Sequence, residues 1–343
     1  MISATTRYVS SIAAIALVSG CQSFNQTSEE AYFREPGEAL LGHPTPVGKQ
    51  AARDVTFAFL SEQVYRNTEE GRADEVEAKA EQQPLVDLTS CPDSHDALLA
   101  LGWKPWPGFP STSMAKKFAE TGLRAEVWMN LNALKPMVVV TFGGTEGLSG
   151  KDWRSNLRWF FKMRDDQYDQ VQKYFAVKFV KEYEKRLQEP AWAPLKNAAI
   201  FSTGHSLGGG LAQSFAYSLP PSQAVPRVTE VFVFNTTPVT AYTNVPADIR
   251  STNTKGLVIN RIYERGEILA SARSMATLFY KPTTERPAMR AIRYSLFYKS
   301  PLGLISSHKI KPLACGLYSK TNPAEIKTAL EDAANGSGKF SKD

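Results

Sequence analysis

The stretch that decides the fold covers residues 199–216 and reads AIFSTGHSLGGGLAQSFA. Its first five residues predict a short strand, and the residues after Gly210 favour a helix. Between them, Gly204 and Gly208 frame Ser206 in the pattern G-x-S-x-G, whose glycines allow a sharp turn from strand to helix. Such a turn raises the serine hydroxyl above the edge of a sheet, beside the positive end of a helix. Ser206 is therefore a candidate nucleophile, the alternative being a tightly packed glycine turn without chemistry.

Strand and helix patterns alternate on both sides of this turn. The run Val138-Val139-Val140-Thr141 is typical of a buried strand, and residues 167–187 place apolar side chains along one side of a predicted helix. The predicted strands are 123–130, 137–142, 199–203, 228–234 and 257–263. This alternation favours an α/β fold with a central, mostly parallel sheet covered by helices.

Two blocks of the sequence resemble the class 3 lipases, a family of α/β-hydrolases. Residues 200–212 are similar to the segment that carries that family's nucleophile, and residues 138–145, VVVTFGGT, are similar to its strand ending in Phe-Arg-Gly-Thr. Asp152-Trp153 and Asn156-Leu157 match dipeptides that often follow in the family. The resemblance covers roughly residues 123–313. It implies an α/β-hydrolase fold, hydrolysis of lipid esters, and neither metal nor organic cofactor.

A general base is found by elimination. In α/β-hydrolases the chain order is serine, then the acid, then histidine. Of the four histidines, His43 and His95 precede the serine, and His205 lies in the turn itself, where we expect its side chain to be directed away from that of Ser206. His308 remains as the candidate base; a solvated loop histidine is the alternative.

The acid must come from the segment between Ser206 and His308. Catalytic groups gather at the carboxyl ends of parallel strands, which excludes Glu230 at the start of its predicted strand. Glu264 and Glu267 both follow the predicted strand 257–263. The family's aspartate in this turn aligns best with Glu267, so the resemblance favours Glu267 as the acid. The carboxylates of the segment are Glu230, Asp248, Glu264, Glu267 and Glu285.

Two hydrogen-bond donors are needed to stabilise the oxyanion of an acyl-transfer reaction. The backbone N–H of Leu207, directly after the nucleophile, is one candidate. By the resemblance, Thr145 supplies the other, the alternative being a simple β-turn at residues 143–145. Gly143 stands where the family usually has arginine, which leaves the support of this loop in question.

Residues 152–164 follow the predicted oxyanion loop and read as a basic amphipathic helix. Arg154, Arg158 and Lys162 recur at helical spacing, and the intervening aromatic residues form an apolar stripe. This helix is either a lid that contacts lipid or a helix whose aromatic residues pack on the sheet.

The first twenty residues predict export. They contain no acidic residue and one arginine, and the apolar run 12–18 is shorter than a spanning helix requires. Val18-Ser19-Gly20-Cys21 resembles the bacterial lipobox, which implies acylation of Cys21 and attachment to an envelope membrane. Gln22 favours the outer membrane, because inner-membrane lipoproteins often have aspartate there. The alternative is a plain secretory signal. In an oxidising compartment Cys91 and Cys315 form either a disulfide or two buried thiols.

Composition and organisation limit the possible functions. The chain has 343 residues, of which 43% are hydrophobic, and a net charge of +6, which excludes disordered, collagenous and multi-span membrane proteins. No nucleic-acid-binding motif accompanies the positive charge. We predict a signal peptide at 1–20, a tether at 21–48, a helical extension at 49–122, a catalytic domain at 123–330 and a flexible tail at 331–343. The expected activity is that of a lipid-directed serine esterase; a serine peptidase, a thioesterase or a non-catalytic envelope scaffold are the alternatives.

Overall fold

The computed structural model describes residues 26–38, 42–66, 91–144, 167–267, 287–297 and 306–336. These residues form a mixed sheet of nine strands in the order β2-β1-β9-β8-β7-β6-β5-β4-β3. The five central strands are parallel to one another. They are β5 (Met137–Gly143), β6 (Ala199–His205), β7 (Val228–Phe234), β8 (Val258–Glu264) and β9 (Ala288–Tyr294).

Antiparallel strands complete the sheet at both edges. On one side β4 (Arg124–Asn130) pairs with β5, and the two-residue β3 (Lys104–Pro105) pairs with β4. On the other side β1 (Glu30–Arg34) pairs with β9, and β2 (His43–Pro46) pairs with β1. Two of the four residues of β2 are prolines, which cannot donate to a further strand, and β2 is accordingly an edge strand.

The central strands are buried on both faces because their side chains alternate between two apolar layers. Val138 and Val140 of β5 point into one layer, whereas Met137 and Val139 point into the other. Val231 and Phe232 of β7 divide in the same way. This two-sided burial is what a parallel sheet requires, and it explains the near-continuous apolar runs in the sequence.

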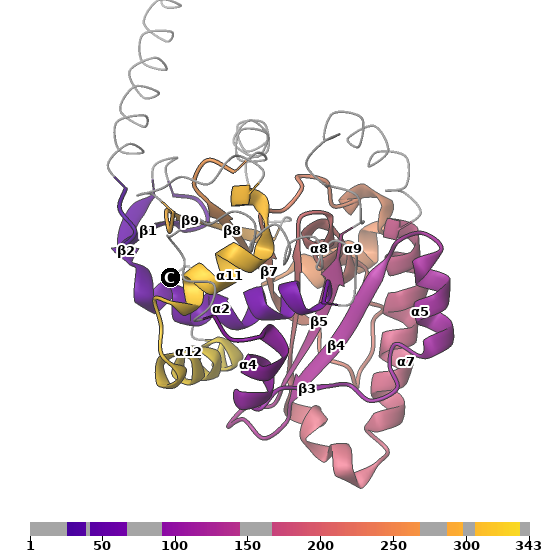
Figure 1. Ribbon diagram of the computed structural model, residues 1–343. Helices are drawn as coiled ribbons and strands as arrows, with labels where there is room; N and C mark the ends of the chain where they lie inside the picture. The colour runs from indigo at the N-terminus through magenta and orange to yellow at the C-terminus, as the bar shows by residue number, and fades with distance from the viewer. Residues whose placement is uncertain are drawn as a thin grey trace, which may run out of the picture.

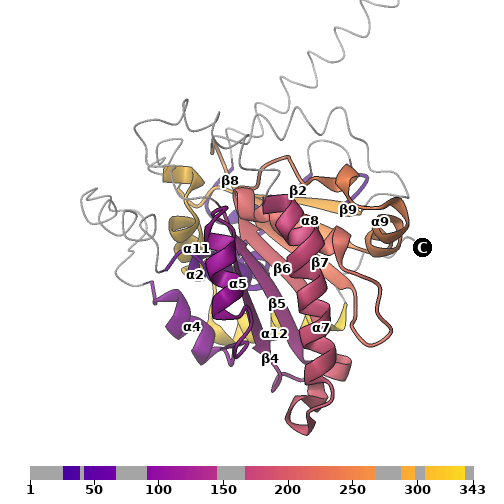
Figure 2. The same ribbon diagram turned by 90° about the vertical axis from the view of Figure 1, so that its right-hand side faces the viewer.

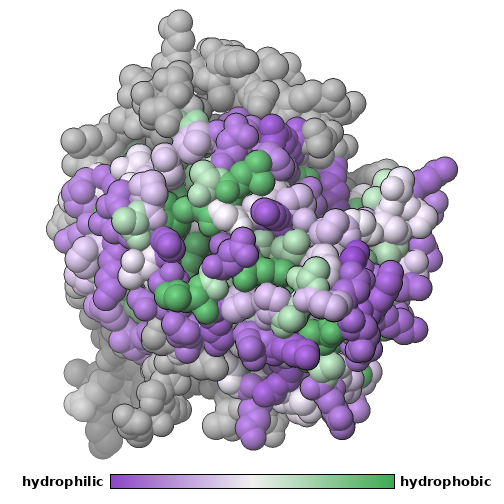
Figure 3. All heavy atoms as spheres, turned by 90° about the horizontal axis from the view of Figure 1, so that it is seen from below, coloured by the Kyte–Doolittle hydropathy of each residue, from purple (hydrophilic) through white to green (hydrophobic). Residues whose placement is uncertain are grey.

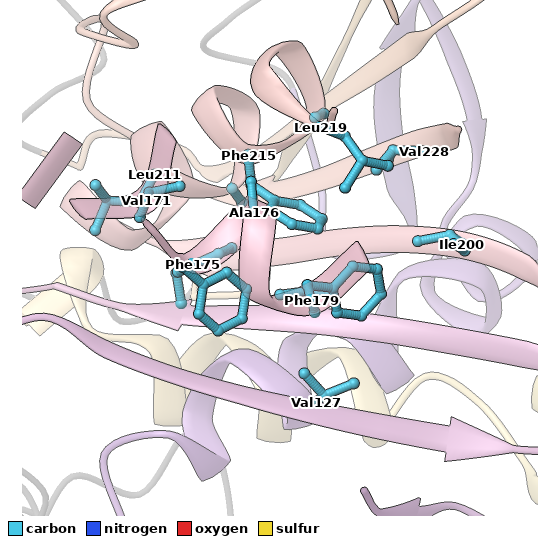
Figure 4. Close-up of a cluster of buried hydrophobic side chains, with 14 of the residues drawn as sticks. Val127, Val171, Phe175, Ala176, Phe179, Ile200, Leu211, Phe215, Leu219 and Val228 are labelled. Carbon is cyan, nitrogen blue, oxygen red and sulfur yellow. The ribbon is translucent and has the colours of Figure 1, made fainter. Parts of the chain in front are cut away.

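One layer contains the helix that follows Ser206. Phe175 and Phe179 pack against Phe215 of α8, with ring centroids 5.7 and 5.4 Å away, and Figure 4 shows these rings above Val127 of β4. The elements of this face are α5 (Thr112–Ala119), η1 (Val171–Phe175), α7 (Ala176–Arg186), η2 (Pro190–Asn197), α8 (Leu207–Ser218), η3 (Tyr242–Asn244) and α9 (Ala247–Thr254). Figure 2 looks onto α5, α7 and α8 in front of the strands.

The other layer contains helices from both ends of the described chain. Phe57 of α2 stacks on Phe232 with a centroid distance of 3.7 Å, so α2 lies against the centre of the sheet (Figure 1). The helices on this face are α2 (Val47–Gln63), α4 (Ser94–Ala100), α11 (Ile310–Tyr318) and α12 (Pro323–Asn335). Cys91, just before α4, is joined to Cys315 of α11 by a disulfide. The sequence had left this pairing open.

The predicted α/β class and hydrolase-type sheet are confirmed, and two of the predicted segments contain regular structure that the sequence did not indicate. The tether 21–48 contains β1 and β2, which pair with β9 across the chain. Within the helical extension 49–122, α2 packs on the sheet itself. Residues 331–335, assigned to the flexible tail, belong to α12, which buries Ala333 and Ala334. Residues 1–25, with Cys21, lie outside the described residues.

One face of the molecule, seen from below, is mostly polar. Seen from below, hydrophilic side chains alternate with smaller apolar areas (Figure 3). The large hydrophobic side chains exposed in the described part are Leu99 and Leu134. Leu134 precedes β5, at the opposite end of the parallel strands from Ser206. Among the described helices, none combines the length and hydropathy that crossing a bilayer would demand.

A polar network is buried between α2 and the sheet. The Tyr294 hydroxyl donates to Asp54 Oδ2 at 2.8 Å, and Arg53 pairs with Glu230, which also accepts from Asn260. Burial raises the pKa of Asp54 to about 6, although Arg53 and the Tyr294 hydrogen bond oppose the shift. Glu230 therefore has a structural role at the end of the sheet opposite to Ser206, where the sequence placed it.

We expect the stability of the fold to depend on the charge of Asp54. The pKa of Asp54 is about 6 in the folded state, against 3.8 for a free side chain. The stabilising contribution of this carboxyl group to the free energy of unfolding is therefore fully present below pH 3.8 and is lost as the pH rises through 6. The shift corresponds to about 3 kcal/mol. Between about pH 4 and about pH 7, the free energy of unfolding of Asp54→Asn should therefore rise by about 3 kcal/mol relative to that of the wild type. Urea unfolding at a series of pH values measures this difference. A difference between the two proteins that stays constant over this range would contradict the assignment.

Candidate active site

Ser206 lies in a sharp turn at the carboxyl end of β6. Its backbone has φ 55° and ψ −121°, a left-handed conformation that a non-glycine residue adopts only when its surroundings enforce it. A Cβ atom at Gly204 would lie 2.4 Å from the Gly208 carbonyl oxygen, and one at Gly208 would lie 2.1 Å from the Phe142 oxygen. Both positions of the G-x-S-x-G pattern thus require glycine, and α8 begins directly after the serine.

His308 lies between the serine and a carboxylate. It ends the short helix η4 (Ser306–His308), with Nε2 3.1 Å from Ser206 Oγ and Nδ1 2.9 Å from Glu267 Oε2. Because a carboxylate accepts, the neutral ring carries its proton on Nδ1, and Nε2 is free to accept from the serine hydroxyl. The structure thus brings together Ser206, Glu267 and His308. His308 follows Glu267 by 41 residues and Ser206 by 102 residues along the chain.

This chain of hydrogen bonds is almost completely enclosed. The exposed fractions are 5% for Ser206, 6% for His308 and 2% for Glu267. A low dielectric environment strengthens hydrogen bonds and charge interactions between such groups. The buried carboxylate of Glu267 can therefore both orient the imidazole and stabilise an imidazolium when the serine proton is transferred.

Glu264, the other acid that the sequence left open, has a different position. Its carboxylate accepts the backbone N–H groups of Leu296 and Phe297, at 3.2 and 3.4 Å, and so holds the turn after β9. Burial is the main cause that raises its pKa to about 7. Asp248 lies in the first turn of α9, and Glu285 lies outside the described residues.

His205 contacts the candidate base, which the sequence did not predict. Its ring packs 4.9 Å from the His308 ring, and its Nε2 lies 2.6 Å from the His308 carbonyl oxygen. Burial lowers the pKa of His205 to about 3, so the ring is neutral. The remaining histidines lie elsewhere: His43 is paired with Glu38 on the surface, and His95 packs against Trp128.

Asn235 is a residue of the site that the sequence reasoning missed. It follows β7 in a left-handed conformation with φ 43°, and its Nδ2 donates to the carbonyl oxygens of His308 and Ser307 at 2.9 and 3.2 Å. Its Oδ1 accepts the N–H of Glu264. The rule that functional side chains follow the carboxyl ends of parallel strands, applied to the end of β7, would have indicated it.

The oxyanion donors are described in part. Leu207 is the first residue of α8, so its N–H has no acceptor within the helix and lies beside Ser206. Thr145 and the predicted amphipathic helix 152–164 lie outside the described residues. Just before Thr145, the Gly144 N–H donates to the Tyr65 hydroxyl at 2.6 Å. Gly143 pairs with Arg124 of β4, whose guanidinium lies 5.8 Å from the centre of the Tyr65 ring.

Comparisons with known proteins give one family match and distant similarities to two lipase structures. Residues 56–225 match a phospholipase-like family, described as the Tle-like phospholipase domain, and no curated protein matches the chain. A deletion mutant of Rhizomucor miehei lipase with its propeptide is 14% identical, over 71% of this chain and 65% of its own, with TM-score 0.38. The chain thus spans slightly less than two thirds of that lipase. A fungal lipase–inhibitor complex is 18% identical, over 68% and 74%, with TM-score 0.37.

The family match covers the region that builds the nucleophile turn. It begins within α2, which packs on the sheet. It includes β6, Ser206 and α8 and ends before β7. Residues 56–225 thus match a lipase-type family, in agreement with the resemblance of the sequence motifs to lipases.

Proposed function

We propose that the protein hydrolyses lipid esters through an acyl-enzyme on Ser206. The observation that carries the proposal is the buried chain of hydrogen bonds from Ser206 through His308 to Glu267, with distances of 3.1 and 2.9 Å. The hydroxyl, the imidazole and the carboxyl group stand in the order that a nucleophile, a base and an orienting acid need. The phospholipase-like family match supports lipid esters as the substrate class.

The geometry accounts for both halves of such a reaction. Ser206 Oγ bonds to the ester carbonyl carbon while its proton passes to His308 Nε2, and the carbonyl electron pair moves to oxygen near the Leu207 N–H. Collapse of this intermediate breaks the ester bond, and the leaving alcohol takes the proton from Nε2. Water then gives a proton to Nε2 and attacks the acyl carbon. Collapse of this second intermediate breaks the bond to Oγ and releases the fatty acid, and Nε2 returns the proton to Ser206 Oγ.

Hydrolysis assays test the substrate class. A phospholipid in vesicles, an emulsified triacylglycerol and short p-nitrophenyl esters are offered to wild type and to Ser206→Ala. We expect Ser206-dependent release of fatty acid from at least one of the two lipids. If only the short esters are cleaved, the enzyme is not a lipase; if nothing is cleaved, the hydrolase proposal itself fails.

Tyr65 allows a test of the oxyanion loop. Its buried hydroxyl accepts the Gly144 N–H, so Tyr65→Phe leaves that amide without this acceptor and loosens the approach to Thr145. We expect kcat to fall about tenfold with little change in KM. Tyr183→Phe is the matched control, because the Tyr183 hydroxyl makes a buried bond to the Leu195 carbonyl on another element. Equal kcat values for the two variants would exclude this role.

We also propose that the mature protein is attached to the outer membrane of a bacterial envelope through acylated Cys21. The lipobox-like sequence and Gln22 support this location. Cys21→Ser should move the protein from the membrane fraction to the soluble fraction and leave its specific esterase activity unchanged. The mature wild type should carry the mass of a lipid on its first residue. An unmodified N-terminus with unchanged fractionation would contradict the anchor.

A further inference from the structure

Two side chains from outside the triad contact the backbone of His308. The His308 carbonyl oxygen lies 2.6 Å from His205 Nε2 and 2.9 Å from Asn235 Nδ2. Both side chains are buried, with exposed fractions of 5% and 0%. Because a carbonyl oxygen only accepts, both nitrogens must be donors.

His205 links the histidine to the nucleophile turn. It directly precedes Ser206 and ends β6, so its backbone is fixed by the strand and by the turn. Burial keeps the ring neutral, and the bond to the carbonyl requires the tautomer with the proton on Nε2. A movement of the His308 backbone away from Ser206 would break this bond.

Asn235 links the same carbonyl to the acid. Its own N–H donates to the Ile262 carbonyl at 2.9 Å, and its Oδ1 accepts the Glu264 N–H, which orients the amide and leaves Nδ2 facing the carbonyls of Ser307 and His308. Glu264 is followed three residues later by Glu267, whose N–H lies 3.4 Å from the Glu264 oxygen. The side-chain amide of Asn235 thus connects the turn that carries Glu267 to the turn that carries His308.

We infer that His205 and Asn235 are positioning residues, which hold the His308 backbone so that its ring reaches Ser206 and Glu267 at once. The inference rests on the proposed function. A single turn of η4 supplies little rigidity of its own, whereas proton transfer tolerates little displacement of the ring. A displacement of about 1 Å in such a site costs about 10²-fold in rate.

The test uses substitutions that change one donor each. Asn235→Asp keeps the shape and the acceptor toward Glu264 but places an oxygen against the two carbonyls. Asn253→Asp is the matched control, because buried Asn253 of α9 donates in the same way to the carbonyls of Tyr217 and Leu219. His205→Met removes the second donor, and His205→Gln retains an amide donor near the position of Nε2.

We expect Asn235→Asp and His205→Met to lower kcat about 10²-fold with KM changed less than about threefold. His205→Gln should stay within about tenfold of wild type and Asn253→Asp within about threefold. The downfield proton resonance of His308 Nδ1–H should shift or broaden in the first two variants only. If one of the two fails to fold, the other still gives the answer.

Two outcomes overturn the inference in different ways. If Asn235→Asp and His205→Met match Asn253→Asp in kcat and keep the wild-type resonance, the carbonyl contacts are structural only. If the wild-type protein shows no Ser206-dependent hydrolysis, the proposed function fails first and the positioning role fails with it, which the wild-type assay alone reveals.

Discussion

Ser206→Ala, His308→Ala and the double variant should have the same residual activity, about 10⁶-fold below wild type in kcat. The reason is that the two side chains act in one step, the transfer of the Oγ proton to Nε2 across 3.1 Å. Once either is missing, the other has nothing to contribute. The remaining rate comes from substrate binding and from oxyanion donors such as the Leu207 N–H.

The comparison is made with the best ester substrate at saturation, on proteins that show wild-type unfolding transitions. Additive losses, in which the double variant is slower than either single variant by a further large factor, would mean that Ser206 and His308 act in separate steps. A nearly active His308→Ala would mean that another group is the base.

Glu267→Gln should be the second most damaging change. It keeps the shape of the side chain but replaces the carboxylate that accepts from His308 Nδ1, so that the ring loses its preferred tautomer and the imidazolium its counter-charge. The equivalent change in a protease triad lowers kcat about 10⁴-fold, and we expect a loss of this order with an unchanged melting temperature.

Glu264→Gln is the matched comparison for this prediction. An amide nitrogen in place of one carboxylate oxygen would face the N–H of Leu296 or Phe297, so we expect a lower melting temperature. The kcat of the folded protein should stay within about tenfold of wild type, because the carboxylate that touches His308 remains. The opposite ranking of the two variants in kcat would assign the triad acid to Glu264.

The centre of the sheet could be predicted because local patterns determine it. The valine run of β5 and the apolar strand β7 are buried on both faces, so their sequences are distinctive without knowledge of their neighbours. The nucleophile turn is equally local, since steric limits at Gly204 and Gly208 act within a few residues. His308 followed from chain order alone.

The edges of the sheet could not be predicted in this way. In β9 the buried Arg290 interrupts the apolar alternation, and it is accommodated through Glu35, which lies 255 residues earlier in the chain. β1 and β2 occupy a stretch whose prolines and charges suggested a tether, and they form strands because β9 offers an edge. Such elements depend on contacts between distant segments, which composition does not reveal.

The positions of polar side chains in the site were predicted least well. The contact of His205 could not be predicted, because the carbonyl that it contacts belongs to a residue 103 positions later in the chain. Asn235 has no motif around it, and its importance emerges only when three turns meet at the carboxyl ends of β6, β7 and β8. Elimination among carboxylates left Glu264 and Glu267 open, and only the arrangement of these turns separates them.

The most direct test of the central proposal is the intact mass of the protein after treatment with a fluorophosphonate, followed by peptide mapping. A serine activated by His308 should attack the phosphorus, lose its proton to Nε2 and expel fluoride. The account predicts one added phosphonyl group on wild type, located on Ser206, and none on Ser206→Ala. Labelling that persists in Ser206→Ala, or a folded wild type that takes up no label, would contradict it.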